Sequence, residues 1–428
     1  MQMISRIIKP FILIQCALVL ALPCVARGEI LEKLILTALA AHPSIQAQQA
    51  QERGARADVD SARWQYFPTP SVSVEKARAS ASDPSYPGSS TMSTVRLQQP
   101  LWSGGRLQAG MKKAEASVIQ SEAVLEDTRW QLALRVLQTY GDWLASHLKA
   151  LAYDKSMISH MRLHDLVQRR IGQGLSSDSD LVLAVSRETA LSADIAVTRA
   201  QKEIALARLG QLLGRSVDDA ELTQTLAMAR PLEPNLNSLL DKALALSPNV
   251  QKAQAQALID ESVVAQRRAE LKPEVYLRLE RQYGNYAFPN AAPENRVFIG
   301  VSSSFGAGLS NLSNIESANA QHEADLAQVE VQNRAVSEQV LADYALASSS
   351  AGRLDALGVS LDAAQQVSSS YDRQFLAGRK SWLDVMNAAR ELAQTEVQLA
   401  DVVSAQVIVS WRLAIYTRGL ASVVGENN

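Results

Sequence analysis

The chain has 428 residues, 20% of them charged, and its formal net charge is −2 at pH 7. This balance lacks the basic excess that marks nucleic-acid-binding proteins, so we expect no nucleic acid among its partners. Aromatic residues contribute only 5% of the chain. That is low for one large packed core and is typical of long helices rich in alanine.

Residues 1–26 predict a secretory signal peptide. Two basic residues, Arg6 and Lys9, precede an apolar run, and small residues then lead to a cleavage site after Ala26. Both cysteines of the chain, Cys16 and Cys24, leave with this peptide. We therefore expect a mature protein without disulfides or thiolate metal sites. Its net charge becomes −2 − 2 = −4 because two positive charges are removed.

Two other forms of membrane attachment are disfavoured. A lipoprotein signal would place a lipid on Cys24, but Pro23 directly before it fits that signal poorly. After the signal peptide there is no apolar run of about 18 residues or more, so we expect no membrane-spanning helix.

The chain contains two copies of one unit. Pro43 aligns with Pro248 at an offset of 205 residues, and Gly104 aligns with Gly308 at an offset of 204. The same register matches Tyr140 with Tyr344, Arg169 with Arg373, Gly174 with Gly378 and Asp180 with Asp384. We expect a first repeat over 27–230 and a second over 231–428. Each has the order helix, strand, strand, very long helix, helix.

Four short segments alternate between apolar and polar residues with the period of a β-strand. They are residues 71–74, 94–98, 275–282 and 297–302, within two strand pairs at about 70–101 and 273–305. In the third segment Val275, Leu277 and Leu279 share one face, and Arg278 and Glu280 share the other. Charges opposite a uniformly aliphatic face are typical of a membrane barrel with a wet interior.

The surroundings of these strands favour the same interpretation. The loops at 79–91 and 284–295 are rich in Pro, Gly, Ser and Asn, as extracellular barrel loops are. Aromatic residues lie at the strand ends, as in a membrane girdle: Tyr66, Phe67, Trp102 and Phe305. The alternative is two hairpins of a soluble mixed domain. Because four strands cannot close a barrel and lipid permits no open edge, a membrane location requires several chains to share one barrel.

A very long helix is predicted from Arg106 to Arg170. These 65 residues contain no proline, and a helix of this length measures about 98 Å, more than an ordinary domain core. Two rows of mostly apolar residues run along it with heptad spacing, one from Leu107 to Leu132 and one from Ala116 to Leu144. Because the rows lie about 150° apart, the helix is expected to pack against a neighbour on each side, as in a ring of helices.

The chain resembles the TolC family of outer-membrane efflux proteins over essentially the whole mature sequence. The resemblance rests on the tandem repeat, on Gln211-Leu212-Leu213-Gly214, on the strand-to-helix junction with Pro100, Trp102, Gly104 and Gly105, and on two glycine turns at 170–181 and 371–385. Each motif is weak alone, and their order and spacing together carry the resemblance.

The resemblance implies a homotrimer in the outer membrane of a Gram-negative bacterium. The implied fold is mainly α with a membrane β-barrel: three copies of four strands form a 12-stranded barrel (3 × 4 = 12). The long helices, 106–170 and about 312–375, continue it as a 12-helix α-barrel through the periplasm. Shorter helices near 30–65, 178–213, 235–270 and 382–418 pair with them.

The implied partners are a periplasmic adaptor protein, an inner-membrane ABC or proton-driven transporter, and outer-membrane lipid. The turns at Gly174 and Gly378 reverse the helical hairpins, because glycine forms a left-handed helix cap at low steric cost. With Leu175, Ser177 and Ser381 they are expected to form the periplasmic entrance and to contact the adaptor.

Two aspartates follow these turns. The resemblance implies that Asp384 forms a threefold acidic ring at the entrance, which attracts cations. Where relatives carry a second acid this chain has Asn387, so we expect a weaker cation preference. The alternative, for Asp180 and Asp384 alike, is ordinary favourable electrostatics at a helix N-terminus.

Polar links between neighbouring hairpins are expected to hold the entrance shut. The candidate pair, here called the entrance latch, is Asp180 with Arg379 or Lys380. Phe375 stands where relatives often carry a tyrosine, so a link through that hydroxyl is missing.

Evidence for catalysis is weak. His160 and His164 have the i, i+4 spacing of metal ligands but lack the glutamate of a metalloprotease motif, so a packed or solvated pair is favoured. The junction glycines complete no nucleotide-binding pattern, and no nucleophile elbow is present. We expect no enzyme, no metal and no cofactor.

The leading hypothesis is a passive exit duct of a tripartite export machine. The alternative is a periplasmic or surface coiled-coil structural protein without a pore. The junction resembles the type I protein secretion branch more than small-molecule efflux. Because the wall of a shared duct need not recognise its cargo, the sequence leaves the substrate open.

Overall fold

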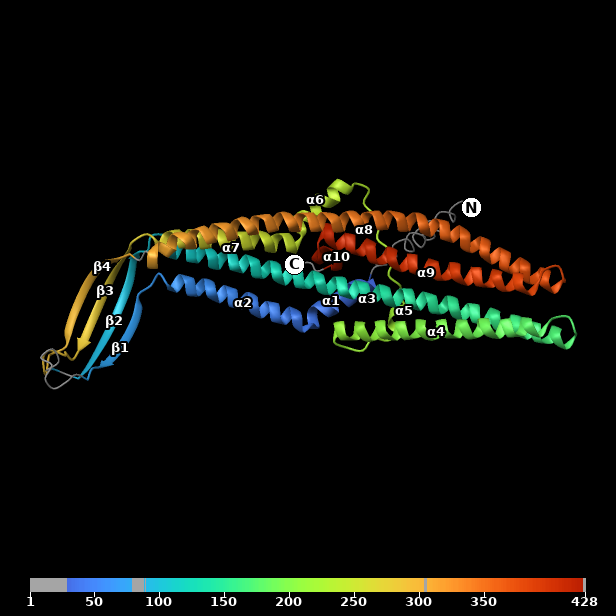
Figure 1. Cartoon of the computed structure of the whole chain (residues 1–428), viewed down its shortest axis with the longest axis horizontal. Coiled ribbons are helices and arrows are strands. Elements are labelled where there is room, and N and C mark those ends of the chain that lie inside the picture. The colour runs from blue at the N-terminus through green and yellow to red at the C-terminus, as the bar shows by residue number, and fades with distance from the viewer. Residues whose placement is uncertain (1–28, 79–87, 89, 304–305, 426–428) are drawn as a thin grey trace, which may run out of the picture.

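The computed structural model describes residues 29–78, 88, 90–303 and 306–425. The predicted signal peptide with both cysteines, most of the first inter-strand loop and Phe305 lie outside the described residues. The described chain is a long rod of helices with the sheet at one end and, at the other, the turns that connect each long helix to the helix after it (Figure 1).

Two helices of 67 residues run along the rod, α3 (Arg106–Gly172) and α8 (Ser310–Leu376). Each begins beside the sheet and ends at the opposite end of the molecule (Figure 1). Neither contains a proline, so no backbone hydrogen bond is lost inside them. Their ends lie within two residues of the predicted limits.

The shorter helices lie in line beside these two. α2 (Pro43–Trp64) and α4 (Asp178–Leu213) contact α3 one after the other. α7 (Pro248–Glu270) and α9 (Trp382–Arg418) lie between α3 and α8. The described helices therefore form a layer in the order α2 or α4, α3, α7 or α9, α8. α3 has a neighbour on each side, as its two apolar rows predicted, and α8 lies at an edge.

Two of the predicted helices are interrupted by proline. The helix expected near 30–65 is divided into α1 (Glu29–Ala41) and α2, and the one expected near 235–270 is divided into α6 (Leu236–Leu246) and α7. Pro43 and Pro248 are the first residues after the breaks. Proline disfavours a helical conformation in the residue before it and has no N–H to donate, so each can only begin a new helix.

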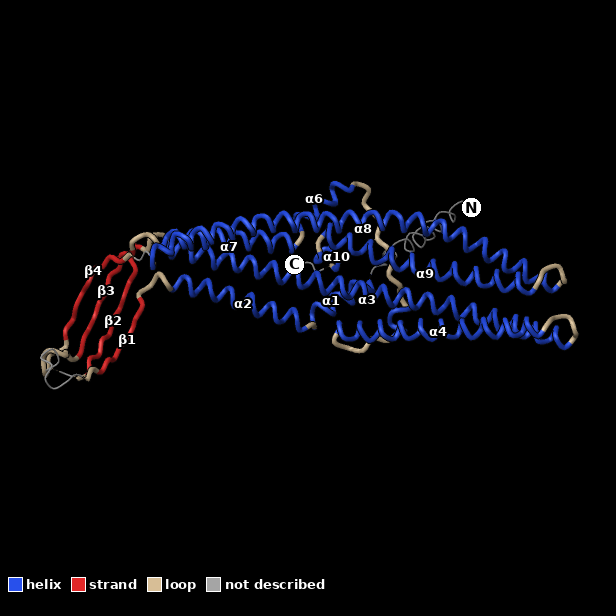
Figure 2. The backbone as a smooth tube through the Cα atoms, viewed as in Figure 1, coloured by secondary structure: helices blue, strands red, loops and turns tan. Residues whose placement is uncertain are grey.

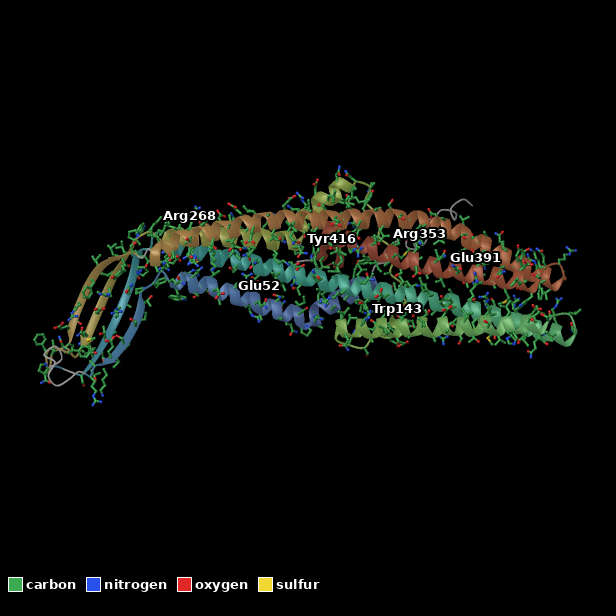
Figure 3. The ribbon with its side chains drawn as sticks, viewed as in Figure 1. Glu52, Trp143, Arg268, Arg353, Glu391 and Tyr416 are labelled. Atoms are coloured by element: carbon green, nitrogen blue, oxygen red, sulfur yellow. The ribbon has the colours of Figure 1, made fainter. Side chains whose placement is uncertain are left out.

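The main hydrophobic core lies near the middle of the rod. There α1 and two five-residue helices, α5 (Asp219–Thr223) and α10 (Leu420–Val424), pack around α3, α4 and α9. The largest fully buried side chains are Trp143, Trp411 and Tyr140. Trp143 and Tyr416, both labelled in Figure 3, lie in this part of the rod. The rod is therefore held together most firmly at its centre.

Among the described helices, α9 is long and apolar enough to span a membrane by length and composition. Our sequence prediction did not anticipate such a helix. More than half of its most apolar stretch, 56%, is buried inside the structure. α9 is apolar because it packs against α3, α6, α8 and α10, which gives it the composition of a core helix.

The strands form one antiparallel sheet, confined to one end of the rod (Figure 2). Its order is β1 (Thr69–Lys76), β2 (Thr91–Trp102), β3 (Glu274–Tyr283), β4 (Glu294–Ser302). β2 pairs with β3, so the sheet joins the two halves of the chain. β1 and β4 each keep a free edge within the described chain.

Candidate functional site at the strands and the hairpin tips

One face of the sheet is aliphatic and exposed. The strand register places Leu97, Leu279 and Val297 in one row across β2, β3 and β4, and Leu277 and Ile299 in the next. The exposed fractions of Val297 and Ile299 are 69% and 76%. So continuous an aliphatic surface is unfavourable in water, and it marks a face that meets another apolar medium.

The opposite face carries ion pairs. Arg96 of β2 lies opposite Glu280 of β3, and its Nε donates to Oε1 at 2.7 Å. Arg278 lies 3.2 Å from the same oxygen, and Arg296 pairs with Glu294 on β4. The sheet thus carries most of its aliphatic residues on one face and most of its charged residues on the other, as a barrel wall does with lipid on one side and water on the other.

The junction between the sheet and α3 depends on glycine. Gly104 and Gly105 have φ angles of +63° and +100°, in the left-handed region that other residues rarely adopt. A Cβ on Gly104 would lie 2.6 Å from Cβ of Lys272. An ion pair of 2.6 Å between Arg106 and Glu274 then ties the start of α3 to β3. This junction holds the sheet directly on the end of the rod.

Aromatic residues surround this junction. Trp102, at the end of β2, is 50% exposed, and Tyr66 and Phe67 before β1 are also exposed. The register between β2 and β3 shifts between Pro100 and Trp102, where a residue without an N–H is tolerated. Exposed aromatic rings at the end of an apolar strand face are typical of a membrane–water boundary.

At the other end of the rod, the two hairpin tips (residues 173–177 and 377–381) have the same backbone geometry. The φ angles of Gly174 and Gly378 are +70° and +73°. In each tip the residue after the glycine, Leu175 or Arg379, donates its amide to a carbonyl five residues earlier at 2.8 Å. This bond and the left-handed glycine together end a helix and reverse the chain.

Asp180 and Asp384 cap the helices that begin at the tips. Each forms a capping box, with Ser177 before α4 and with Ser381 before α9. Asp384 accepts hydrogen bonds from the Ser381 hydroxyl (2.8 Å) and amide (3.1 Å). These bonds lower the pKa of Asp384, so it is ionised at neutral pH. Asn387 is exposed one turn further along α9.

Within one chain the residues of the entrance latch do not meet. The Asp180 carboxylate accepts from the Ser177 amide at 3.1 Å, and no salt bridge among the described residues joins it to Arg379 or Lys380. The Lys380 ammonium lies 4.2 Å from the centre of the Tyr371 ring instead. A contact between Asp180 and either cation would have to come from a neighbouring copy of the chain.

Two contacts that the sequence analysis missed join the hairpins within one chain. Arg162 of α3 forms a salt bridge with Asp372 of α8. The Arg170 guanidinium carbon lies 4.7 Å from the centre of the Phe375 ring, which packs against Trp382 at 6.0 Å. Phe375 is therefore a buried anchor, and the hydroxyl of a tyrosine is not needed for it to hold the hairpins together. The heptad pattern shows which residues face a neighbour, but not which neighbour they meet.

The two histidines have different partners. His160 is buried, with Nδ1 2.9 Å from the Ser156 carbonyl oxygen, whereas Nδ1 of His164 lies 3.0 Å from the Glu188 carboxylate on α4. No group of three or more metal-ligating side chains occurs among the described residues. His160 is thus a buried side chain bonded within α3, and His164 joins α3 to α4.

A sheet with a lipid-type face and a charged face, set on the end of a helical rod, defines a membrane channel protein. A family model described as outer membrane efflux protein matches residues 34–215 and 239–417. The chain belongs to this family. It is an outer-membrane channel protein, not an enzyme, with strands for the membrane and a helical extension for the periplasm. Channels of this family form trimers in tripartite systems.

Two relatives and one solved structure illustrate the match. The chain is 25% identical over 316 residues to the alkaline protease secretion protein AprF of Pseudomonas aeruginosa, covering 71% of this chain and 64% of AprF. It is 25% identical over 317 residues to the cobalt-zinc-cadmium resistance protein CzcC of Cupriavidus metallidurans, covering 73% and 74%. The matched segment thus spans slightly less than two thirds of AprF. The fold is similar to that of CusC, with a TM-score of 0.78, 16% identity, and coverage of 91% and 92%.

Proposed function

We propose that the chain assembles as a homotrimer that forms a passive exit duct through the outer membrane. The open four-stranded sheet with its exposed aliphatic face supports this most directly. β1 and β4 each have a free edge within the described chain, and a bilayer tolerates no open edge. Three copies would supply 3 × 4 = 12 strands. α8 of one copy would then pack on α2 and α4 of the next and close a ring of helices.

Two tandem repeats, 27–230 and 231–428, are part of this proposal. The family model matches the chain in two separate segments, one in each repeat. The described elements also occur in the same order in both, with α3 and α8 as the equivalent long helices. Because the unit is duplicated, each copy of the chain supplies two β-hairpins and two helical hairpins. Three copies would then supply enough of both to close the barrel and the ring of helices.

At the periplasmic end, Asp384 of three copies forms an acidic ring, and Asp180 meets Arg379 or Lys380 of the neighbouring copy as the entrance latch. The hydrogen bonds from Ser381 that lower the pKa of Asp384 within each chain favour the charged form that such a ring requires. The double variant Asp180→Ala, Lys380→Ala should raise single-channel conductance in planar bilayers, because it removes a link that holds the entrance narrow. An unchanged conductance would contradict the latch.

The duct catalyses no reaction and binds no cofactor. Transport is driven by an inner-membrane ABC or proton-driven transporter, through a periplasmic adaptor that binds the hairpin tips around Gly174, Ser177, Gly378 and Ser381. The exposed apolar side chain of Leu175, 62% of which is accessible at one tip, supports a protein contact there.

The proposed duct could carry either of two classes of cargo, secreted proteins or small molecules and metal ions. One relative is named for alkaline protease secretion and the other for cobalt, zinc and cadmium resistance. The strand-to-helix junction favours type I protein secretion. Single cysteines at Ser177 or Ser381 would be the only thiols of the mature chain, so they allow the adaptor to be crosslinked in intact cells and identified. An adaptor of an ATP-driven transporter supports protein secretion, and one of a proton-driven pump supports small-molecule efflux.

Heating separates the duct from the alternative, a coiled-coil protein without a pore. A duct extracted from outer membranes in mild detergent should migrate as a trimer and collapse on heating to a chain of 46.5 kDa or slightly less. A chain that is soluble without detergent and forms no conducting pore would contradict the proposal.

A further inference from the structure

The charged face of the sheet contains an arginine without a carboxylate of its own. The register assigns seven charged residues to this face: Glu75, Arg96, Glu274, Arg278, Glu280, Glu294 and Arg296. Arg296 pairs with Glu294, and Arg96 pairs with Glu280 at 2.7 Å. Glu274 is already paired with Arg106 at the base of the sheet. Two residues of this face are left over, Arg278 and Glu75.

Arg278 shares the carboxylate that Arg96 already holds. Nε of Arg278 lies 3.2 Å from Oε1 of Glu280, but this nitrogen atom is buried and forms no hydrogen bond with any described residue. The Arg278 side chain as a whole is 27% exposed. One carboxylate charge is therefore divided between two guanidinium groups. One positive charge per chain remains uncompensated at this level of the sheet.

Aromatic rings hold the Arg278 side chain in place. Its guanidinium carbon lies 4.6 Å from the centre of the Phe298 ring and 5.9 Å from that of Tyr276. Gly300, opposite Tyr276 in the register, makes room for this ring, because a Cβ there would lie 2.4 Å from it. Rings of this kind orient a guanidinium without neutralising its charge.

The other acid on this face is too far away to compensate. Glu75 lies six residues along β1 from Thr69, which shares the row of Gln98 and Arg278. At about 3.4 Å per residue this is about 20 Å, well beyond the screening length of about 8 Å at physiological salt. The excess charge of Arg278 therefore acts locally.

We propose that Arg278 forms an anion-binding ring on the inner wall of the membrane barrel, which favours cargo bearing carboxylate or phosphate groups. This rests on the proposed trimeric duct, in which three copies bring three such charges to one level of the lumen. A pore with low-dielectric walls focuses the field of charges along it. The ring has the opposite sign to the acidic ring proposed at the entrance.

Block of the open channel by an acidic peptide tests this. Purified full-length trimers are placed in planar bilayers, and hexaglutamate is titrated from either side while ionic current is recorded. Arg278→Gln should weaken the block by about tenfold, the scale of one charged contact. Arg278→Lys should retain most of it. Glu280→Gln should strengthen it several-fold, because both arginines then lack a carboxylate.

The matched control lies on the same strand. Arg281 is exposed on the aliphatic face, beside the Tyr283 ring at 5.3 Å, so Arg281→Gln should leave the block unchanged. Equal block of wild type and Arg278→Gln, or equal weakening by Arg281→Gln, overturns this inference alone. A protein that forms trimers but conducts no current, even with the double variant Asp180→Ala, Lys380→Ala that removes the entrance latch, overturns the proposed duct and the inference with it. If Arg278→Gln fails to assemble, Glu280→Gln still tests the inference, because it should strengthen the block by hexaglutamate. An unchanged or weaker block in Glu280→Gln would then overturn the inference.

Discussion

The two long helices have equal length and equivalent places in the chain, yet they are buried very differently. Both contain 67 residues, but 22 residues of α3 are buried and only six of α8. α3 lies inside the layer of helices, with α2 and α4 on one side and α7 and α9 on the other. α8 packs on α7 and α9 along its length and on the short helix α6 near its middle, and it lies at the edge of the layer. Position in the layer, and not local sequence, therefore decides how much each helix buries.

This difference indicates where a second copy belongs. α8 has apolar side chains that remain exposed in the single chain, including Val331, Leu341 and Val359. Exposed apolar residues distributed along a helix that lacks a neighbour mark an interface. α3 is a scaffold within one chain, and α8 is the edge from which an assembly can close.

The largest expected loss of stability follows from a substitution in α3, the more deeply buried of the two long helices. Trp143 of α3 is fully buried and donates its indole N–H to Asp219 at 2.8 Å. Trp143→Ala should lower the free energy of unfolding by about 3–5 kcal/mol, since it leaves a large cavity. The measurement is loss of helical circular dichroism in urea. The matched variant Val359→Ala, on α8 and 72% exposed, should cost about 0.5 kcal/mol or less. A comparable loss at Val359 would show that another copy already covers α8 there.

The second largest expected loss of stability concerns the buried ion pair that joins α8 to α9. Asp343 is 1% exposed and accepts from Arg412 Nε on α9 at 2.7 Å. Asp343→Ala leaves the Arg412 guanidinium without its partner and should cost about 3–5 kcal/mol in the same urea experiment. Replacing both residues, as in Asp343→Leu with Arg412→Met, should recover most of that loss. Failure of the double variant to recover stability would show that the pair itself, and not the unpaired charge, stabilises α8.

Assembly should depend on the free side of α8. At about 100° per residue, Val331 lies opposite the side formed by Val340 and Asp343, and it is 52% exposed. Val331→Asp should weaken trimer formation by at least about tenfold, because a carboxylate would be buried between copies. Val331→Thr, of similar shape, is the control. The fraction of heat-sensitive trimer in detergent measures both, and an intact Val331→Asp trimer would place the interface elsewhere.

The smallest effect is a pH dependence between α7 and α8. A hydrogen bond with Asp260, burial and repulsion by Asp260 raise the pKa of Asp325. The folded chain then binds this proton more tightly than the unfolded chain. The resulting stability is fully present below the ordinary pKa of an unfolded aspartate and is lost as the pH rises through the raised pKa of the folded chain. Asp325→Asn should therefore raise the melting midpoint by about 1–2 °C at pH 7 and change it little at pH 4. Equal shifts at both pH values would contradict a shared proton.

Local signals were strong in this sequence. The absence of proline over 106–170 predicted α3, and the alternation of Val275, Leu277 and Leu279 predicted the aliphatic face of β3. The glycines at 174 and 378 predicted both turns, because a left-handed residue is needed where a helix reverses. The helix breaks before Pro43 and Pro248 were available from the same kind of signal, but the predictions ran across them.

Long-range contacts could not be predicted in this way. Arg162 and Asp372 are 210 residues apart, and Arg96 and Glu280 are 184 apart. Arg162 and Asp372 lie on helix surfaces whose heptad pattern is compatible with packing against several different helices. The entrance latch pairs opposite charges at the tips. Within one chain the Asp180 carboxylate accepts from the Ser177 amide, so the latch stays a prediction about neighbouring copies.

The sequence by itself determined the elements of this protein: two long helices, four strands, the two glycine turns, and the sorting of β3 into an aliphatic and a charged face. These depend on backbone preference and on side-chain period, which act within a few residues. Only the tertiary structure decided that α3 is enclosed and α8 is not, that Phe375 lies under Arg170, and that Arg278 shares a carboxylate with Arg96. Those outcomes depend on which surfaces meet, and many surfaces of similar pattern compete for each other in one chain.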